Sequence, residues 1–374
     1  MPDLKKIREE AAKLAPNDPP EVGWMRWLDA RLASESEPPI TPWWRATLDD
    51  FWRSGLPFFA STKGQRSTAS TTITRALVIE TLLRERTVVL DQIAVCVIMS
   101  ANTAEANQRC EPLEAVLKGI GLVNVDKRDK VDLGYYFASL SPQTGRSTFE
   151  ASDADGNRVR WSVSPATREA ASGSTGAGAL VDELDLWQDK DGGKNPAPDV
   201  LTLLHGRIHG QAGAHIYHVS TPMGPQAPLS TLITESETGG AEGLYVARLG
   251  ELGARRDGEA RAAFVRHLQE RARTGRDRPQ RAAAERWASD PRLLRDPDPR
   301  STCVPTWAAR AGEPAQEILE CWRLAGVRLR KGEDGGDPLD VLLSRYGAQP
   351  SGDAGRRVFG AGLIAAAQAR ESVW

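Results

Sequence analysis

The sequence predicts an α/β fold, with a mostly parallel β-sheet flanked by helices and a helical region toward the C-terminus. Short apolar runs alternate with longer segments of helical periodicity, an order typical of successive strand–helix–strand units. Two of these apolar runs end in small polar or acidic residues, near positions 63–71 and 182–183. Because open parallel sheets bind ligands at the carboxyl ends of their strands, these positions are the first candidates for a functional site.

Composition limits the class of protein. The chain has 374 residues, 40% hydrophobic and 26% charged, as in a globular protein of about two domains. Its net charge of −2 gives no overall basic signature, so any nucleic-acid contact needs a local patch. The four cysteines form no CxxC pair, which argues against zinc. The N-terminus lacks a secretory signal and no apolar run could span a membrane, so we expect a cytoplasmic protein without membrane contact.

Residues 1–40 predict two helices around a proline-rich break, which we treat as an N-terminal appendage. Tryptophans are dense from here into the next segment, and Trp43 and Trp44 are adjacent. Packing against a sheet is the more common role of such aromatics. The alternative is that residues 43–56, and Trp43 in particular, stack on the adenine of a nucleotide ahead of a phosphate loop.

A strand, a small polar loop and a helix come next in the chain. The strand PFFASTK ends at Lys63, and the loop GQRSTAST leads into an amphipathic helix. Such a loop directs backbone N–H groups and a helix N-terminus at an anion, and so predicts a phosphate-binding loop. The pattern GxxxxGK[ST] is met only in part, because Ala69 and Ser70 replace its second glycine and its lysine. One alternative is a register with Lys63 first and Ser70 as the metal-side hydroxyl; another is a helix cap without a ligand.

A second strand–helix unit follows. Residues 88–101 predict a buried strand, and the polar residues after it begin a helix that runs to about Lys118. Alternating segments between residues 121 and 165 contain an Asp155-Gly156 turn typical of a hairpin. We expect this hairpin to be a strand pair at the edge of the sheet.

The run GALVDELDLW predicts another buried strand, which ends in Asp182 and Glu183. In phosphoryl-transfer ATPases the first acid of such a pair holds magnesium and the second polarises the attacking water. The alternative is a pair of acids that caps a helix. The next strand, AHIYHV, ends in Ser220, Thr221 and Pro222. Such hydroxyls sense the γ-phosphate in ATP-driven nucleic-acid motors, although the same residues also make ordinary turns.

The rest of the chain is mostly helical. Residues 226–300 predict arginine-rich helices, whose arginines form either a solvated face paired with acids or a patch that faces DNA or another subunit. A further helix is predicted over residues 314–324. We therefore divide the chain into an appendage at 1–40, an ATPase core at 41–225 and a helical lid or linker at 226–374.

In this order the segments resemble the large terminase subunit of tailed bacteriophages, the ATPase that pumps DNA into the capsid. The resemblance covers about residues 40–374 and rests on the tryptophan-rich lead-in, KGQRSTAST, IMSANTAEAN, GAGALVDELDLW and HVSTPMGP. It implies a P-loop NTPase fold of the RecA/ASCE type, with ATP and Mg²⁺ as cofactors. It also implies double-stranded DNA, a portal that carries a homo-oligomeric ring, and a small terminase subunit as partners, in a bacterial host cell.

The resemblance also implies site residues. The nucleotide-binding set is Lys63, Gly64, Gln65, Arg66, Ser67, Thr68, Ala69, Ser70 and Thr71, with Trp43 beside the base. The metal residues are Asp182 and either Ser70 or Thr71, and the coupling residues are Ser220, Thr221 and Pro222. Glu183 is the catalytic carboxylate and Arg66 the loop arginine that responds to the γ-phosphate. Lys63 or Arg66 must supply the charge of the absent Walker A lysine.

Two departures from the family open competing hypotheses. Large terminases usually continue into an RNase H-like nuclease domain, but Asp337, Asp340 and Asp353 lie in a glycine-rich setting unlike a two-metal site, so we expect no nuclease activity here. With the absent lysine, this favours a non-hydrolysing prophage relic or DNA-binding assembly protein, against which the intact Asp182-Glu183 pair argues. A helicase-type ATPase outside phage is a third hypothesis, which lacks a second set of motifs after residue 226.

Overall fold

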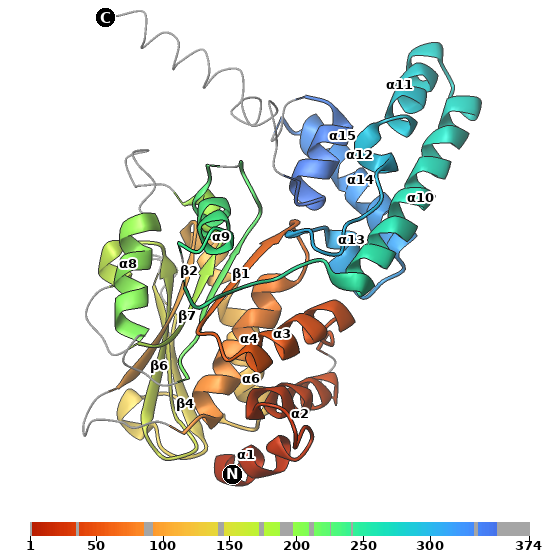
Figure 1. Ribbon diagram of the computed structural model, residues 1–374. Coiled ribbons are helices and arrows are strands. Elements are labelled where there is room, and N and C mark those ends of the chain that lie inside the picture. Colours follow the sequence, from red (N-terminus) through yellow and green to blue (C-terminus); the bar gives the residue numbers. More distant parts are fainter. Residues whose placement is uncertain are drawn as a thin grey trace, which may run out of the picture.

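The computed structural model describes residues 2–34, 37–85, 93–140, 146–171, 176–187, 197–208, 213–224, 226–240, 242–332 and 336–349. Within these ranges ten strands form one sheet, in the order β10-β1-β8-β7-β2-β6-β5-β4-β3, with β9 also paired to β1 (Figure 1). The strands are β1 (Phe58–Lys63), β2 (Ala94–Ser100), β3 (Val123–Val125), β4 (Tyr135–Ser139), β5 (Ser147–Ser152), β6 (Arg158–Pro165), β7 (Gly176–Asp182), β8 (Ile216–Ser220), β9 (Leu244–Val246) and β10 (Cys303–Val304).

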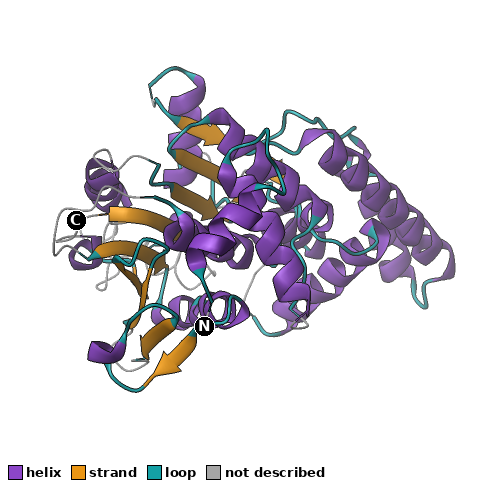
Figure 2. Ribbon diagram, turned by 90° about the horizontal axis from the view of Figure 1, so that it is seen from below, coloured by secondary structure: helices purple, strands orange, loops and turns teal. Residues whose placement is uncertain are grey.

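Helices surround the sheet and form the C-terminal part of the chain (Figure 2). The N-terminal and sheet-associated helices are α1 (Leu4–Ala12), α2 (Pro20–Ser34), α3 (Pro42–Ser54), α4 (Ala69–Leu83), α5 (Thr103–Asn107), α6 (Cys110–Gly119), η1 (Arg128–Lys130), α7 (Arg168–Ala171), η2 (Leu184–Leu186), α8 (Ala197–Ile208) and α9 (Pro228–Glu237). The C-terminal helices are α10 (Gly250–Thr274), α11 (Arg278–Ala288), α12 (Pro291–Leu294), α13 (Thr306–Ala309), α14 (Pro314–Arg330), α15 (Pro338–Val341) and η3 (Leu342–Tyr346). None of the described helices is long and apolar enough to cross a bilayer.

The sheet is mostly parallel, as the sequence predicts. Strand β1 pairs in parallel with β8, β8 with β7, β7 with β2, and β2 with β6. Only β5 runs antiparallel to its neighbours β4 and β6 in the described sheet. Strand β8 thus lies between the strand of the phosphate loop and the strand of the acid pair. This is the P-loop NTPase fold of RecA/ASCE type expected from the sequence.

Two apolar clusters cover the two faces of the sheet, because successive strand residues point to opposite sides. On one face Phe59, Leu180 and Tyr217 pack under α2, α3, α4 and α6. On the other face Ala60, Val181 and Ile216 pack under α8 and α9. A third cluster belongs to the C-terminal helices α10 to α15, which lie beside the carboxyl edge of the sheet (Figure 1).

The N-terminal helices are not a detached appendage, because Leu28 and Leu32 of α2 belong to the same cluster as the sheet. They also change the character of α4. The sequence predicts an amphipathic helix there, but 14 of its 15 residues are buried, because α1 and α2 cover the side that the sheet leaves open. Even Glu80 is buried, and its carboxylate accepts hydrogen bonds from Trp52, at 2.8 Å, and Tyr217.

Several predicted elements differ from those in the structure. The second strand begins at Ala94, and residues 86–92 before it lie outside the described residues. The helix predicted after it is two helices, α5 and α6. The predicted edge hairpin is wrong in place: β6 pairs with β2 inside the sheet, and β5, β4 and β3 extend the sheet beyond it. The short strands β9 and β10 escaped prediction. The apolar segment near residues 357–368 lies outside the described residues.

The packing of α1 on α2 can be tested at Gly23. A Cβ atom there would overlap the backbone carbonyl of Ala11, and backbone cannot move aside cheaply. We expect Gly23→Ala to lower the free energy of unfolding by about 1–3 kcal/mol in urea denaturation. Gly206→Ala is the matched control, since a Cβ at this helical glycine meets nothing within 4 Å. It should leave stability unchanged or raise it by up to about 1 kcal/mol. Equal effects of the two changes would contradict the packing.

A second prediction concerns His218 on β8. The ring is fully buried, its Nδ1 lies 2.8 Å from the Phe59 carbonyl, and burial, followed by the charge of His205, lowers its pKa to about 3. As pH falls below the unfolded value of about 6.5, the unfolded chain gains a proton that the folded chain refuses, so stability falls. Replacement by Asn, which keeps a donor for Phe59, should reduce the pH slope of unfolding free energy between pH 6 and 4 by about 1 kcal/mol per unit. Identical slopes would contradict the burial argument.

Candidate functional site

Four neighbouring parallel strands end at one edge of the sheet and bring the predicted residues together. The phosphate loop follows β1, Ser220 ends β8, Asp182 ends β7, and α5 follows β2. A cavity of about 520 Å³ opens at this edge. It is lined by Lys63, Gln65, Arg66, Ser67, Thr68, Ala69, Ser70, Thr71, Glu105, Gln108, Arg109, Glu183, Leu186 and Arg328.

The loop itself is shaped to receive an anion. Arg66 and Thr68 have positive φ values of 64° and 65°, a left-handed backbone that non-glycine residues seldom adopt. Such alternation of backbone conformation turns successive N–H groups toward one point. Thr68 gives α4 no side-chain cap, which leaves the first-turn N–H groups to the cavity. The Ser67 hydroxyl is buried without a hydrogen-bond partner among the described residues.

The loop is held from behind by segments distant in sequence. Gly64 N–H donates to the Val304 carbonyl at 2.9 Å, and Gln65 N–H donates to the Arg345 carbonyl at 2.7 Å. Gly64 lies so close to this region that a Cβ atom would overlap the carbonyl oxygen of Tyr346. The glycine is therefore required by the approach of η3, and its own φ is not positive.

Two buried side chains complete this support. The Thr306 hydroxyl donates to the Gln65 carbonyl at 2.6 Å, and the Trp44 indole N–H donates to the Ser67 carbonyl at 2.8 Å. Trp43 does not have the predicted place beside a nucleotide base. Its ring is buried edge-on against Trp44, its N–H donates to the Leu249 carbonyl at 2.8 Å, and it does not line the cavity. We therefore correct that expectation.

Asp182 is fully buried and held from two sides. The Ser70 hydroxyl donates to its Oδ1 at 2.6 Å, and Nε of Arg109 lies 2.9 Å from its Oδ2. Of the two hydroxyls that the sequence left open as metal partners, Ser70 is the one that contacts the acid, and Thr71 lines the cavity. This contact fits the register in which Lys63 comes first and the left-handed Thr68 replaces the second glycine.

Glu183 follows Asp182 in a left-handed conformation, with φ of 54°. Its Oε1 forms an ion pair with the Lys63 ammonium. Its Oε2 accepts a hydrogen bond from the backbone N–H of Thr221 at 2.9 Å. The predicted catalytic acid is thus in direct contact with both the phosphate-loop strand and the predicted coupling segment.

A second contact joins the acid strand to the coupling segment. The Ser220 hydroxyl accepts a hydrogen bond from the Asp185 N–H at 3.0 Å. The Asp185 carboxylate in turn accepts from the Leu229 N–H at 2.8 Å, and burial raises its pKa to about 6. Pro222 is buried next to these residues in the chain. The three predicted coupling residues therefore form one side of a short bonded network.

Sequence reasoning missed several residues of the cavity: Glu105, Gln108, Arg109, Leu186 and Arg328. The strand end IMSANTAEAN signalled a place for the first three but not their role. Burial, and then the charges of Glu183 and Asp182, raise the pKa of Glu105. No local signal indicates Arg328, since it comes from α14, far along the chain. The arginine nevertheless adds positive charge to the cavity wall.

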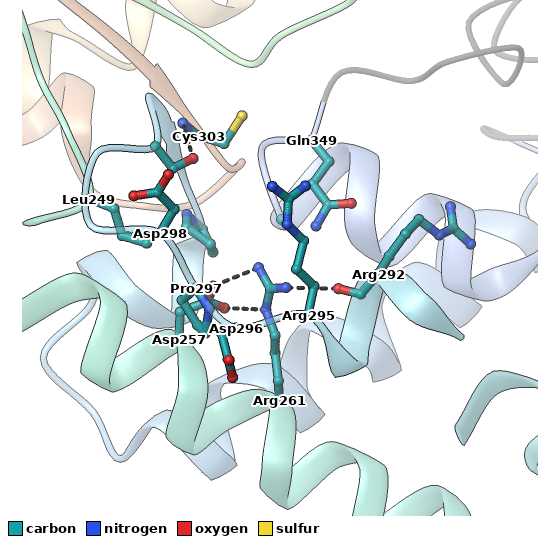
Figure 3. A pocket seen from close by; sticks show the side chains of 13 residues that line it. Leu249, Asp257, Arg261, Arg292, Arg295, Asp296, Pro297, Asp298, Cys303 and Gln349 are labelled. Carbon is teal, nitrogen blue, oxygen red and sulfur yellow. Dashed lines mark hydrogen bonds and ion pairs between the residues drawn. The ribbon is translucent and has the colours of Figure 1, made fainter. Parts of the chain in front are cut away.

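A second cavity of about 290 Å³ lies among α10, α12 and β10 and contains none of the predicted site residues (Figure 3). Its arginines have structural partners. Arg261 donates to the Asp257 carboxylate at 2.8 Å and to the Arg292 carbonyl at 2.7 Å, and Arg292 pairs with Asp340 at 2.8 Å. Asp340, like Asp337 with its ion pair to Arg286, serves the packing of these helices.

Solved structures similar to this chain include three large terminases. They are the large terminase of a thermophilic bacteriophage in complex with ADP (13% identity, TM-score 0.38, 55% of this chain and 44% of that chain), the ATPase domain of the Thermus phage P74-26 large terminase (14%, 0.32, 48% and 64%) and the HK97 bacteriophage large terminase (10%, 0.41, 80% and 55%). The matches thus span between 44% and 64% of those chains. No protein-family model and no curated protein sequence matches the chain. The proteins found are of the kind that the ordered sequence segments resemble.

The support of the phosphate loop can be tested at Thr306, which is fully buried. Thr306→Val keeps the shape but leaves the Gln65 carbonyl without its hydrogen bond, which should lower the free energy of unfolding by about 1–3 kcal/mol. Amide hydrogen exchange over residues 64–68 should also become faster, because the loop loses an anchor. As a control, Thr234→Val removes an exposed helical hydroxyl bond of 2.9 Å and should change stability by less than about 0.5 kcal/mol. Unchanged exchange in the Thr306 variant would show that the loop needs no such support.

Proposed function

We propose that this chain is an ATP hydrolase and the ATPase motor subunit of a phage or prophage terminase. In that role it couples hydrolysis to translocation of double-stranded DNA into a procapsid. One observation carries the ATPase part: the loop side chains Ser70 and Lys63 contact the acids Asp182 and Glu183, respectively, at the carboxyl edge of the sheet. The motor part is supported by the ordered segments that resemble large terminases.

The cavity fits a polyphosphate. Positive side chains gather on its wall, from Lys63, Arg66, Arg109 and Arg328. The uncapped N-terminus of α4 adds a partial positive charge, and the buried Ser67 hydroxyl has no other hydrogen-bond partner among the described residues. An anion that received these groups would satisfy polar atoms that the protein leaves open.

Ser70 and Asp182 are the residues that would hold Mg²⁺, since this ion prefers hydroxyl and carboxylate oxygens. In the described part of the chain no cluster of three or more His, Cys, Asp or Glu side chains could bind a metal by itself. The remaining ligands therefore come from substrate and water, as is usual for magnesium at nucleotides. The bound ion neutralises charge on the β- and γ-phosphate oxygens.

Lys63 replaces the absent Walker A lysine in this proposal. Its ammonium group now pairs with Glu183, and phosphate oxygens attract it away from this partner. Glu183 is thereby released to orient the water that attacks the γ-phosphate. Its second oxygen stays on the Thr221 N–H, so the orientation of the catalytic carboxylate depends on the coupling segment.

The partners belong to the proposal as well. A homo-oligomeric ring on a portal, with a small terminase subunit, is the assembly that the resemblance implies, in the cytoplasm of a bacterial host. Local positive charge for the DNA backbone is supplied by exposed arginines of the α10–α11 hairpin: Arg266, Arg271, Arg276, Arg278 and Arg281. Contacts of this type predict DNA binding that weakens steeply with salt.

Steady-state ATP hydrolysis by the full chain, with and without double-stranded DNA, tests the proposal. Activity should require Mg²⁺, and Glu183→Gln should reduce it by roughly 10²- to 10⁴-fold. The same variant should still bind ATP, because the phosphate loop is intact. Lys63→Met should lower both hydrolysis and ATP binding.

Glu285→Gln is the matched control, since Glu285 lies exposed on α11, away from the cavity wall. It should hydrolyse ATP like the wild type. Full activity in Glu183→Gln would contradict the assignment of the catalytic acid. Binding of ATP by the wild type without any turnover, even with DNA present, would favour the non-hydrolysing assembly protein instead.

A further inference from the structure

Arg109 holds the buried acid that the proposed function assigns to Mg²⁺. It lies between α5 and α6, lines the cavity, and has a side chain that is 14% exposed against 0% for Asp182. Its Nε atom is 2.9 Å from Oδ2 of Asp182. The other oxygen, Oδ1, is taken by the Ser70 hydroxyl at 2.6 Å. Both oxygens of the carboxylate are therefore engaged by the protein itself.

The ion pair is incomplete as a hydrogen bond. Although the two atoms are close, the N–H of Arg109 Nε is buried without a hydrogen-bond acceptor among the described residues. A buried donor without an acceptor carries a desolvation cost. The attraction between Arg109 and Asp182 is thus mainly that of two charges, which a second cation at Asp182 would oppose.

A second acceptor for the arginine lies nearby. Glu105 is four residues before Arg109, lines the same cavity, and interacts electrostatically with it. The Oε2 atom of Glu105 is buried and has no hydrogen-bond partner in the described part of the chain. An unsatisfied arginine N–H and an unsatisfied carboxylate oxygen therefore line one cavity.

We propose that Arg109 is a positioning residue that competes with Mg²⁺ for Asp182 and transfers to Glu105 when the metal binds. This rests on the proposed function, because it takes Asp182 as a metal residue. Without metal, Arg109 neutralises the buried acid and keeps the strand end folded. With metal, the arginine leaves for Glu105 and stays beside the phosphates. The cost of moving it raises the Mg²⁺ concentration that nucleotide binding needs.

A purely structural arginine predicts the opposite response. Its loss would loosen the site and weaken the binding of both metal and nucleotide. Competition predicts that loss of the arginine makes Mg²⁺ bind more readily. The direction of the change therefore separates the two roles, and no assay of turnover is needed.

The test is ADP binding to the full chain by calorimetry over a series of Mg²⁺ concentrations. In Arg109→Met, half-maximal ADP binding should need roughly fivefold less Mg²⁺ or lower still. In Glu105→Gln it should need more Mg²⁺, because the displaced arginine has lost its acceptor. In the double variant, Glu105→Gln should add nothing to the effect of Arg109→Met.

A second readout uses the chain without nucleotide. In EDTA, Arg109→Met should unfold at a lower temperature than the wild type, because Asp182 is left buried and unpaired, and Mg²⁺ with ADP should reduce the difference. Arg128→Met is the control, since Arg128 pairs with Glu150 at 2.8 Å and does not line the cavity. Its Mg²⁺ requirement should equal that of the wild type.

The outcomes distinguish the two claims. If the wild type shows no Mg²⁺-dependent ADP binding, the proposed function fails. If the wild type binds but Arg109→Met needs the same or more Mg²⁺, the competition is wrong. Should Arg109→Met not fold, Glu105→Gln decides alone: a raised Mg²⁺ requirement supports the transfer, and an unchanged or lowered one overturns it.

Discussion

The candidate site depends on the parallel pairing of β1, β8, β7 and β2, which makes four strands end at one edge. Parallel strands direct their following loops to the same side, so the loop, the acid pair and the coupling segment meet without any local sequence signal between them. The insertion of β8 between β1 and β7 places Thr221 against Glu183, 38 residues earlier in the chain. The site is thus a consequence of topology.

The electrostatics of this edge follow from burial. Asp182 has no exposure to water, and a buried carboxylate needs a partner. In the structure the partners are the protein's own cations, Arg109 for Asp182 and Lys63 for Glu183. The same groups that bind a polyphosphate therefore stabilise the acids before it arrives. The helical region belongs to this arrangement, since Val304, Thr306 and Arg345 hold the loop by hydrogen bonds.

Much of the fold could be predicted because it depends on local patterns. The apolar runs at β1, β7 and β8 predict strands, and the polar residues after them predict the carboxyl edge. The buried character of α4 could not be predicted, because it depends on α1 and α2 covering its outer side. Nor could β10, which is only two residues long and exists through its pairing with β1.

The candidate site shows the same division. The acids and the loop are contiguous in sequence, and their side chains do meet. Arg109 and Arg328 join the cavity through tertiary packing, so neither has a signature in the chain. Trp43 shows the converse error: its position before the loop suggested stacking on a base, whereas packing buries its ring. Gly64 was assigned to the loop motif, but the close approach of Tyr346 is what requires it.

The most direct test of the central claim is a crystal structure of the full chain with Mg²⁺ and a non-hydrolysable ATP analogue. The phosphates should lie on residues 64–71, with the metal between Ser70 and Asp182, and the Lys63 ammonium should have left Glu183 for the phosphates. A nucleotide bound elsewhere, or an intact Lys63–Glu183 pair beside bound phosphates, would contradict the claim that this sheet edge is an ATP site.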